Sequence, residues 1–142
     1  MLAYKLGLPV FLPMRDSHVD FLNIMTTLSG KVKRVVHRHT DPSLKNLQEL
    51  LGGWTVGLTG AIAHEGFNSE IISEIPLDRL MIETESSLWG LEMLLGGLRA
   101  GLNEPCVISF VVKKIAELRK DCSEAEIANC TSKVAKGFLR FT

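Results

Sequence analysis

Short apolar runs recur along the chain, and each is followed by a polar segment. The runs cover residues 8–12, 32–36, 54–58 and 79–82, and the polar segments cover residues 13–15, 37–41, 59–60 and 83–85. Successive polar segments are roughly 23 residues apart, which is the length of one strand, one helix and two short loops. This repeat predicts four βα units whose parallel strands bring their polar ends to one edge of a sheet.

Amphipathic segments between the runs predict the helices. The first helix should begin after Ser17 and turn inward a stripe formed by Val19, Leu22, Met25 and Leu28. For the second helix, Asp41 is the expected N-cap and Pro42 the first-turn residue. A helix should therefore follow each of these strands and cover one face of the sheet.

The regular spacing ends after the fourth run. Residues 86–101 are apolar and rich in glycine, which is consistent with a short helix over the strand ends or with a poorly ordered segment. Pro105 then begins an amphipathic helix, and Ser123 with Glu126 forms a capping box for a last one. Two C-terminal helices are therefore expected after the sheet.

The composition limits the partners and the cellular compartment that can be expected. Sixteen acidic residues balance sixteen basic ones, so no overall charge directs the chain toward nucleic acid or an anionic membrane. Three widely spaced cysteines without a Cys-x-x-Cys pair suit a reducing compartment, so a cytoplasmic or nuclear protein is expected. The first apolar run is too short to span a bilayer, and no membrane partner is expected.

The number of units limits the architecture. A closed eight-stranded βα barrel needs about 250 residues, whereas this chain has 142 and four units. We therefore expect one α/β domain over residues 1–142 that forms half of a TIM-type barrel, with parallel strands and outer helices. A second chain could complete the barrel, and a free-standing open sheet is the alternative.

Five segments are similar to motifs of the TatD-like deoxyribonuclease family and follow its order. They are LPVFLPMRD at 8–16, VVH at 35–37, TVGLTG at 55–60, IPLDRLMIETE at 75–85 and NEP at 103–105. They resemble the C-terminal half of a family member, most closely in the eukaryotic branch. The resemblance implies a metal-dependent hydrolase that cleaves DNA phosphodiester bonds with divalent ions at the carboxyl ends of the strands.

Individual residues take their expected roles from this resemblance. His37 and Glu85 correspond to metal ligands for Mg²⁺, Mn²⁺ or Zn²⁺, and Glu85 also takes a catalytic role. Arg15 and Glu83 are expected to contact the DNA substrate, Arg15 by clamping a phosphate with its planar guanidinium. The alternatives are structural: His37 would bond a loop carbonyl, Glu83 would cap backbone amides and Glu85 would face water. Arg15 would then pair with Asp16 or Asp20.

The sequence departs from the family pattern at two ligand positions. Pro13 stands where the family has a histidine, and Glu85 stands where it has an aspartate. These changes predict an impaired nuclease, with a non-catalytic TatD-derived binding protein as the alternative and a small-molecule-binding module ranked last. His39 would share a side with His37 by strand alternation and could replace the lost ligand, but a place on the loop surface is expected.

Overall fold

The computed structural model describes residues 2–26, 32–64, 66–86 and 103–139, and its centre is a parallel sheet. The strands lie in the order β1-β2-β3-β4, each paired with the next along the chain. They are β1 (Val10–Pro13), β2 (Arg34–His37), β3 (Thr55–Leu58) and β4 (Leu80–Ile82). The predicted parallel sheet is confirmed, although each strand begins one or two residues later than expected.

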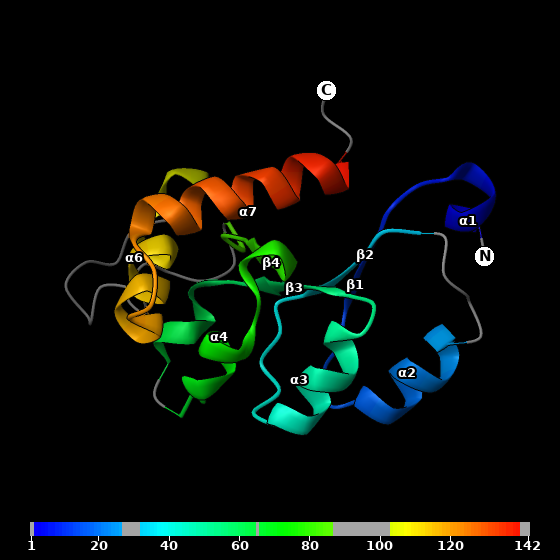
Figure 1. Ribbon diagram of the computed structural model, residues 1–142. Coiled ribbons are helices and arrows are strands. Elements are labelled where there is room, and N and C mark those ends of the chain that lie inside the picture. The colour runs from blue at the N-terminus through cyan, green and yellow to red at the C-terminus, as the bar shows by residue number, and fades with distance from the viewer. Residues whose placement is uncertain (1, 27–31, 65, 87–102, 140–142) are drawn as a thin grey trace.

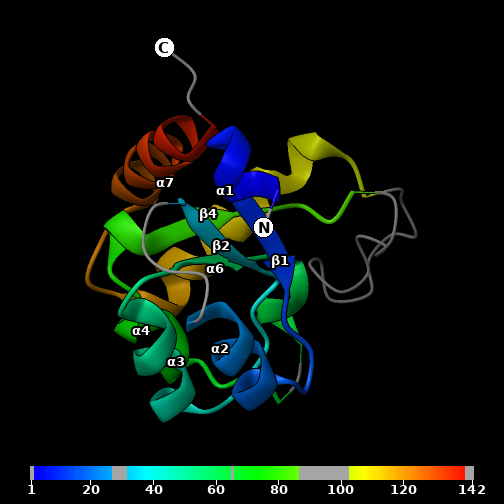
Figure 2. The same cartoon turned by 90° about the vertical axis from the view of Figure 1, so that its right-hand side faces the viewer.

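Helices lie on both sides of this sheet. They are α1 (Leu2–Leu6), α2 (His18–Thr26), α3 (Leu44–Leu51), α4 (Glu70–Glu74), α6 (Ile108–Arg119) and α7 (Glu124–Leu139), with short 3-10 turns η1 (Gly60–Ala63), η2 (Leu77–Arg79) and η3 (Pro105–Val107). Figures 1 and 2 show α2, α3 and α4 on one side and α7 on the other. The two predicted C-terminal helices are confirmed. The apolar segment expected at 86–101 lies almost wholly outside the described residues.

Strand alternation gives the sheet two distinct faces. Val36, Val56, Leu58 and Leu80 point to the side of α2, α3 and α4 and are fully buried there. Val35 and Met81 point to the other side, where they pack against Phe138 of α7. Since side chains two residues apart share a face, His37 at the end of β2 and Glu83 just after β4 project on the same side as Val35 and Met81. We call this side the site face.

The helix starts agree only partly with the sequence patterns. The capping box is confirmed, because Oγ of Ser123 accepts a bond from the Glu126 amide and the Glu126 carboxylate accepts one from the Ser123 amide. The N-cap of α3 is Ser43, not Asp41, so that prediction is wrong. Asp41 instead accepts bonds from the Ser43 amide and the Asn46 side chain. These two bonds hold the Asp41 carboxylate just before the start of α3.

The predicted apolar stripe of α2 is also wrong at Val19, and its last member, Leu28, lies outside the described residues. Val19 is 68% exposed, whereas Met25 is buried. The helix packs on Trp54 through Phe21, Leu22 and Met25, so its buried side is rotated away from Val19. Across the described part of the chain, no helix has both the length and the apolar character that crossing a bilayer demands.

Candidate metal centre

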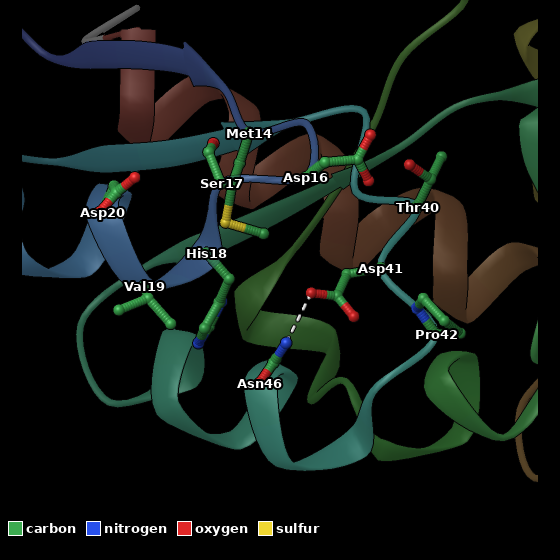
Figure 3. Close-up of a pocket in the computed structure, with 10 residues that line it drawn as sticks. All are labelled: Met14, Asp16, Ser17, His18, Val19, Asp20, Thr40, Asp41, Pro42 and Asn46. Carbon is green, nitrogen blue, oxygen red and sulfur yellow. Dashed lines mark hydrogen bonds between the residues drawn. The ribbon is translucent and has the colours of Figure 1, made fainter.

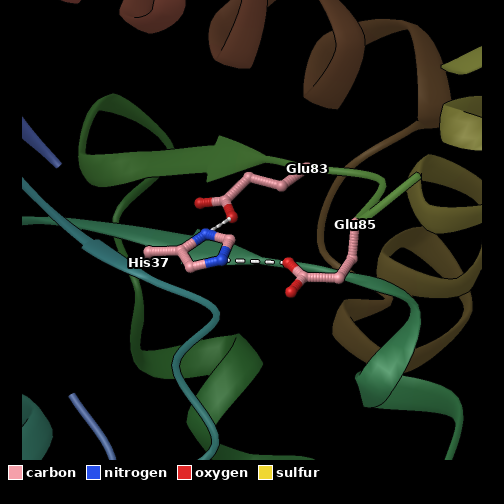
Figure 4. A group of neighbouring side chains, drawn as sticks. All are labelled: His37, Glu83 and Glu85. Carbon is pink, nitrogen blue, oxygen red and sulfur yellow. Dashed lines mark hydrogen bonds and ion pairs between the residues drawn. The ribbon is translucent and has the colours of Figure 1, made fainter. Parts of the chain in front are cut away.

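The last residue of β2 and the segment after β4 bring three ligand-type side chains together on the site face. Nε2 of His37 lies 2.9 Å from Oε2 of Glu85, and Nδ1 of His37 contacts Oε2 of Glu83. The imidazole therefore lies between the two carboxylates, as Figure 4 shows. One donor atom from each residue falls within 4.8 Å of the others. The structure thus brings the two residues expected as metal ligands, His37 and Glu85, into contact.

The separation of His37 and Glu85 fits a shared metal ion. Nitrogen and oxygen ligands lie about 2.1 Å from a divalent ion, so two ligands lie about 3.0 Å apart at the right angle of octahedral coordination and about 3.4 Å apart at the tetrahedral angle that Zn²⁺ prefers. The observed 2.9 Å is close to the octahedral spacing and is also the length of an ordinary hydrogen bond. Imidazole with carboxylate oxygens suits Zn²⁺ or Mn²⁺, and carboxylates also suit Mg²⁺. A proton or a cation can therefore bridge these two atoms.

The carboxylate of Glu83 is surrounded mainly by protein groups and not by solvent. Its Oε1 atom is buried and has no hydrogen-bond partner among the described residues. Burial raises the pKa of Glu83 to about 7, although the adjacent His37 opposes the shift. With the carboxylate ionised, Nδ1–H of His37 donates to it and leaves Nε2 facing Glu85. Whether Glu83 also contacts substrate stays a prediction.

Two residues that support the centre were given no role from the sequence. Gly57 of β3 lies beneath the Glu83 carboxylate, because a Cβ there would lie 1.6 Å from Oε1. Asn103 is 5% exposed, and its amide donates to the carbonyl oxygens of Thr84 and Glu85. A glycine inside a strand often marks a place where another group approaches the backbone closely. The position of Gly57 in the sequence therefore indicated such a contact.

The bond from Asn103 stabilises an uncommon backbone conformation. Glu85 has a φ angle of 53°, a region that non-glycine residues seldom adopt. Asn103 Nδ2 lies 3.0 Å from the Glu85 carbonyl oxygen and bonds the Thr84 carbonyl as well. The segment that begins with Asn103 therefore fixes the loop from which the Glu85 carboxylate reaches His37.

The first strand contributes less to the centre than the family pattern would suggest. Pro13 is in register with His37 on the neighbouring strand, so it occupies the place beside the imidazole but offers no donor atom. Arg15 is exposed in the turn after β1 and is outside the three-residue group. A contact between Arg15 and a phosphate stays a prediction.

His39 does not lie on the loop surface, so that expectation is wrong. It is 2% exposed, and neither ring nitrogen has a hydrogen-bond partner among the described residues. Arg38 has a φ angle of 50°, which breaks strand alternation and separates His39 from His37. Burial lowers the pKa of His39, so the ring is neutral in the folded protein at neutral pH. It is not part of the His37–Glu83–Glu85 group.

A pocket of about 350 Å³ lies between the segments that follow β1 and β2. Figure 3 shows its lining, which includes Asp16, His18, Asp20 and Asp41. Asp41 is engaged by Asn46, and Nε2 of His18 lies 3.1 Å from Glu49. The pocket includes none of the three residues of the candidate metal centre.

Comparison with known proteins identifies relatives of the whole chain. The family model described as "TatD related DNase" matches residues 1–140. A protein named 3'-5' ssDNA/RNA exonuclease TatD from Pectobacterium parmentieri is 34% identical over 126 residues, which cover 83% of this chain and 47% of that protein. A protein of the same name from Erwinia billingiae is 33% identical and covers 96% of this chain and 54% of its own length.

Solved structures agree with the fold. A hydrolase TatD family protein from Entamoeba histolytica superposes with a TM-score of 0.83 at 22% identity, over 97% of this chain and 53% of that chain. A TatD homologue from Escherichia coli K12 superposes with a TM-score of 0.81 at 25% identity, over 99% and 53%. The chain spans about half the length of the relatives it matches, so its four βα units correspond to half of their barrel. Because the family model matches nearly all of the chain and relatives of that family are more than 30% identical to it, this chain belongs to the TatD-related DNase family.

Proposed function

We propose that this chain carries part of the metal-dependent active site of a nuclease that hydrolyses phosphodiester bonds in DNA. The observation that supports the proposal most directly is the 2.9 Å approach of His37 Nε2 to Glu85 Oε2 at the carboxyl ends of the strands. Relatives of this family are named as exonucleases of single-stranded DNA and RNA. His37 and Glu85 are the proposed metal ligands, and Glu85 is the proposed catalytic carboxylate.

Each residue would have a distinct task at such a site. A bound divalent ion would polarise the phosphoryl oxygen and lower the pKa of an attacking water. His37 and Glu85 would hold that ion, and the Glu83 carboxylate would keep the imidazole turned toward it. Arg15, exposed after β1, would bind the substrate phosphate through its planar guanidinium.

A paired assay tests this proposal. Mg²⁺, Mn²⁺ and Zn²⁺ are titrated into the protein by calorimetry, and a labelled single-stranded DNA is assayed for cleavage with each ion. His37→Ala and Glu85→Gln should abolish both binding and cleavage, whereas His64→Ala, which changes an exposed histidine, should leave both intact. If the folded wild-type protein neither binds a metal ion nor cleaves DNA, the proposed nuclease activity is excluded.

A non-catalytic derivative is the second candidate, and Pro13 favours it. Pro13 stands in register beside His37 and supplies no ligand, so the centre has fewer donor atoms than a complete site. Such a protein would bind a metal ion or a phosphate without turnover. In the same assay it would show metal binding in calorimetry and no loss of labelled DNA.

We also propose that a second chain completes the barrel. Within the described residues, β1 and β4 each pair on one side only, which leaves one open edge on each strand. Leu8 and Phe11, beside and within β1, are 50% and 46% exposed, although such residues are usually buried. Light scattering should detect an assembly larger than 15.7 kDa, and a strictly monomeric folded protein would contradict this.

The free cysteines indicate the cellular compartment that we propose for the protein. Cys106, Cys122 and Cys130 are all free, as expected of a protein kept in a reducing compartment. We therefore propose a cytoplasmic or nuclear protein. Fluorescence microscopy of a tagged chain tests this, and a secreted product would contradict it.

A further inference from the structure

A basic recess lies at the end of the strands opposite the metal centre. It has a volume of about 260 Å³ and lies between α7 and the starts of β2, β3 and β4. Its charged lining residues are Lys33, Arg34, Arg79, Lys133 and Asp78. We call this recess the amino-end pocket. Four cations against one carboxylate leave it with a strong local positive charge, although the whole chain is neutral.

The four cations of the amino-end pocket form no ion pair with any described residue, and Asp78, the one carboxylate in its lining, forms none either. Like charges that converge without a counter-ion repel one another, which costs stability unless an anion joins them. An anion in the recess would relieve this repulsion.

The guanidinium of Arg34 stacks on an aromatic ring. Its guanidinium carbon lies 4.9 Å from the ring centre of Trp54, which is itself buried. Its Nε atom is buried and has no hydrogen-bond partner among the described residues. Gly53 provides the space for one terminal nitrogen, which lies 2.5 Å from where a Cβ would be. The guanidinium is thus ordered without being neutralised.

The other cations reach the recess from separate elements. Lys33 precedes β2 and donates a hydrogen bond from Nζ to the Gly137 carbonyl near the end of α7. Lys133 lies one helical turn before Gly137, and Arg79 ends η2 just before β4. The positive charges therefore surround the recess from a strand start, a helix and a turn, so that one anion could contact several of them.

We propose that the amino-end pocket binds a phosphate group. A phosphate carries up to two negative charges and several acceptor oxygens, and the planar forks of Arg34 and Arg79 can bind two of them at once. Arg34 and His37 begin and end the same strand, about 10 Å apart at 3.3 Å per residue, so this site is separate from the metal centre. The phosphate of a free ion, a nucleotide or a nucleic-acid end shares this chemistry.

The experiment uses the whole chain in the presence of a chelator, so that the metal centre contributes nothing. Inorganic phosphate is titrated while amide chemical shifts are followed by NMR. Further arms compare deoxyadenosine monophosphate with deoxyadenosine, and an oligothymidine with and without a terminal phosphate. These arms identify whether a free ion, a nucleotide or a strand end binds most tightly.

Two double variants that remove the same number of positive charges distinguish a specific phosphate site from general electrostatic attraction of phosphate to the protein. Arg79→Gln with Lys133→Gln removes two pocket cations, and Lys45→Gln with Lys113→Gln removes two exposed cations from α3 and α6. All four residues are exposed, so both doubles should fold, and circular dichroism checks this. The single variant Lys133→Gln serves as a substitute if the pocket double fails to fold.

The proposal predicts that phosphate shifts the amides of Thr55 and Gly137 but not that of Glu85. The pocket double should bind phosphate at least tenfold more weakly, since a hydrogen bond to a charged group is worth roughly a factor of ten. The control double should change affinity less than about twofold. Equal losses in both doubles, or no shift at Thr55 and Gly137, would overturn the proposal.

Discussion

The carboxylate of Glu83 occupies the space in which a side chain at Gly57 would begin. A Cβ at position 57 would lie 1.6 Å from Oε1 and 2.7 Å from Cδ of Glu83, and 3.1 Å from the carbonyl oxygen of Val36. The missing side chain on β3 is what allows Glu83 to lie flat on the site face and reach Nδ1 of His37. The geometry of the proposed ligand His37 therefore depends on a glycine in β3, the strand that lies between β2, which ends at His37, and β4, which precedes Glu83.

Gly57→Ala should weaken metal binding without altering any proposed ligand. The methyl group would displace the Glu83 carboxylate, and His37 would lose the partner that orients its ring. Loss of such a supporting bond typically lowers metal affinity by about 10- to 100-fold. Calorimetric titration with Mn²⁺ measures the change.

The control for this substitution is Gly137→Ala in α7. A Cβ there would have no neighbour within 4 Å, and alanine favours a helix over glycine by about 0.5–1 kcal/mol. Gly137→Ala should therefore leave metal affinity unchanged and stabilise the fold slightly. If Gly57→Ala binds Mn²⁺ as tightly as this control, then Glu83 does not position His37.

The buried His39 should make the protein sensitive to mild acid. Burial lowers its pKa below the ordinary 6.5, with nearby Asp41 opposing the shift and His18 adding to it. Below pH 6.5 the unfolded chain therefore binds a proton at this position more readily than the folded one. The contribution of His39 to the free energy of unfolding should fall as the pH drops below 6.5, whereas the raised pKa of Glu83 contributes in the opposite direction. Urea denaturation of the wild type and of a His39 variant between pH 5 and 8 separates the two contributions.

His39→Phe isolates this effect. The substitution removes two ring nitrogens that have no hydrogen-bond partner among the described residues, so stability at neutral pH should rise by about 1 kcal/mol. The variant should gain stability relative to the wild type as the pH falls from 6.5 to 5. His64→Gln, which changes an exposed histidine, should keep the wild-type dependence. Parallel pH curves for His39→Phe and the wild type would contradict the assignment.

The capping box of α7 should contribute measurably to stability. Ser123→Ala removes the acceptor for the Glu126 amide and should cost about 1 kcal/mol. For a domain of this size, that corresponds to a fall in melting temperature of roughly 2–4 °C. Calorimetry measures the shift, and Ser132→Ala on an exposed position of the same helix is the control. An equal effect of the two substitutions would show that the cap is dispensable.

The sequence predicted those features that depend on a repeated local pattern. The four strands followed from apolar runs, and the capping box followed from the spacing of Ser123 and Glu126. The approach of His37 to the segment of Glu83 and Glu85 followed from the fact that parallel strands end at one edge. Each of these inferences needed only the period of the apolar residues, a capping motif or the direction of the strands.

The features that were missed depend on contacts between distant segments or on single backbone angles. The exposure of Val19 depends on how α2 meets Trp54, and the helical period alone does not fix that rotation. The burial of His39 depends on the positive φ angle of Arg38, which strand alternation cannot anticipate. The support of Glu85 by Asn103 joins residues 18 apart in sequence. No pattern along the chain encodes these relationships.

Restoring a donor beside His37 should strengthen the metal centre. Pro13 ends β1 in register with His37, and the edge of β1 away from β2 is unpaired among the described residues, so a residue with an amide hydrogen fits there. Pro13→His would place a second imidazole next to the first and should tighten Mn²⁺ or Zn²⁺ binding by about tenfold or more. Pro13→Leu removes the same ring without adding a donor and should leave the affinity unchanged. If both substitutions give the wild-type affinity in calorimetry, then the strand end at position 13 lies too far from the ion to serve as a ligand.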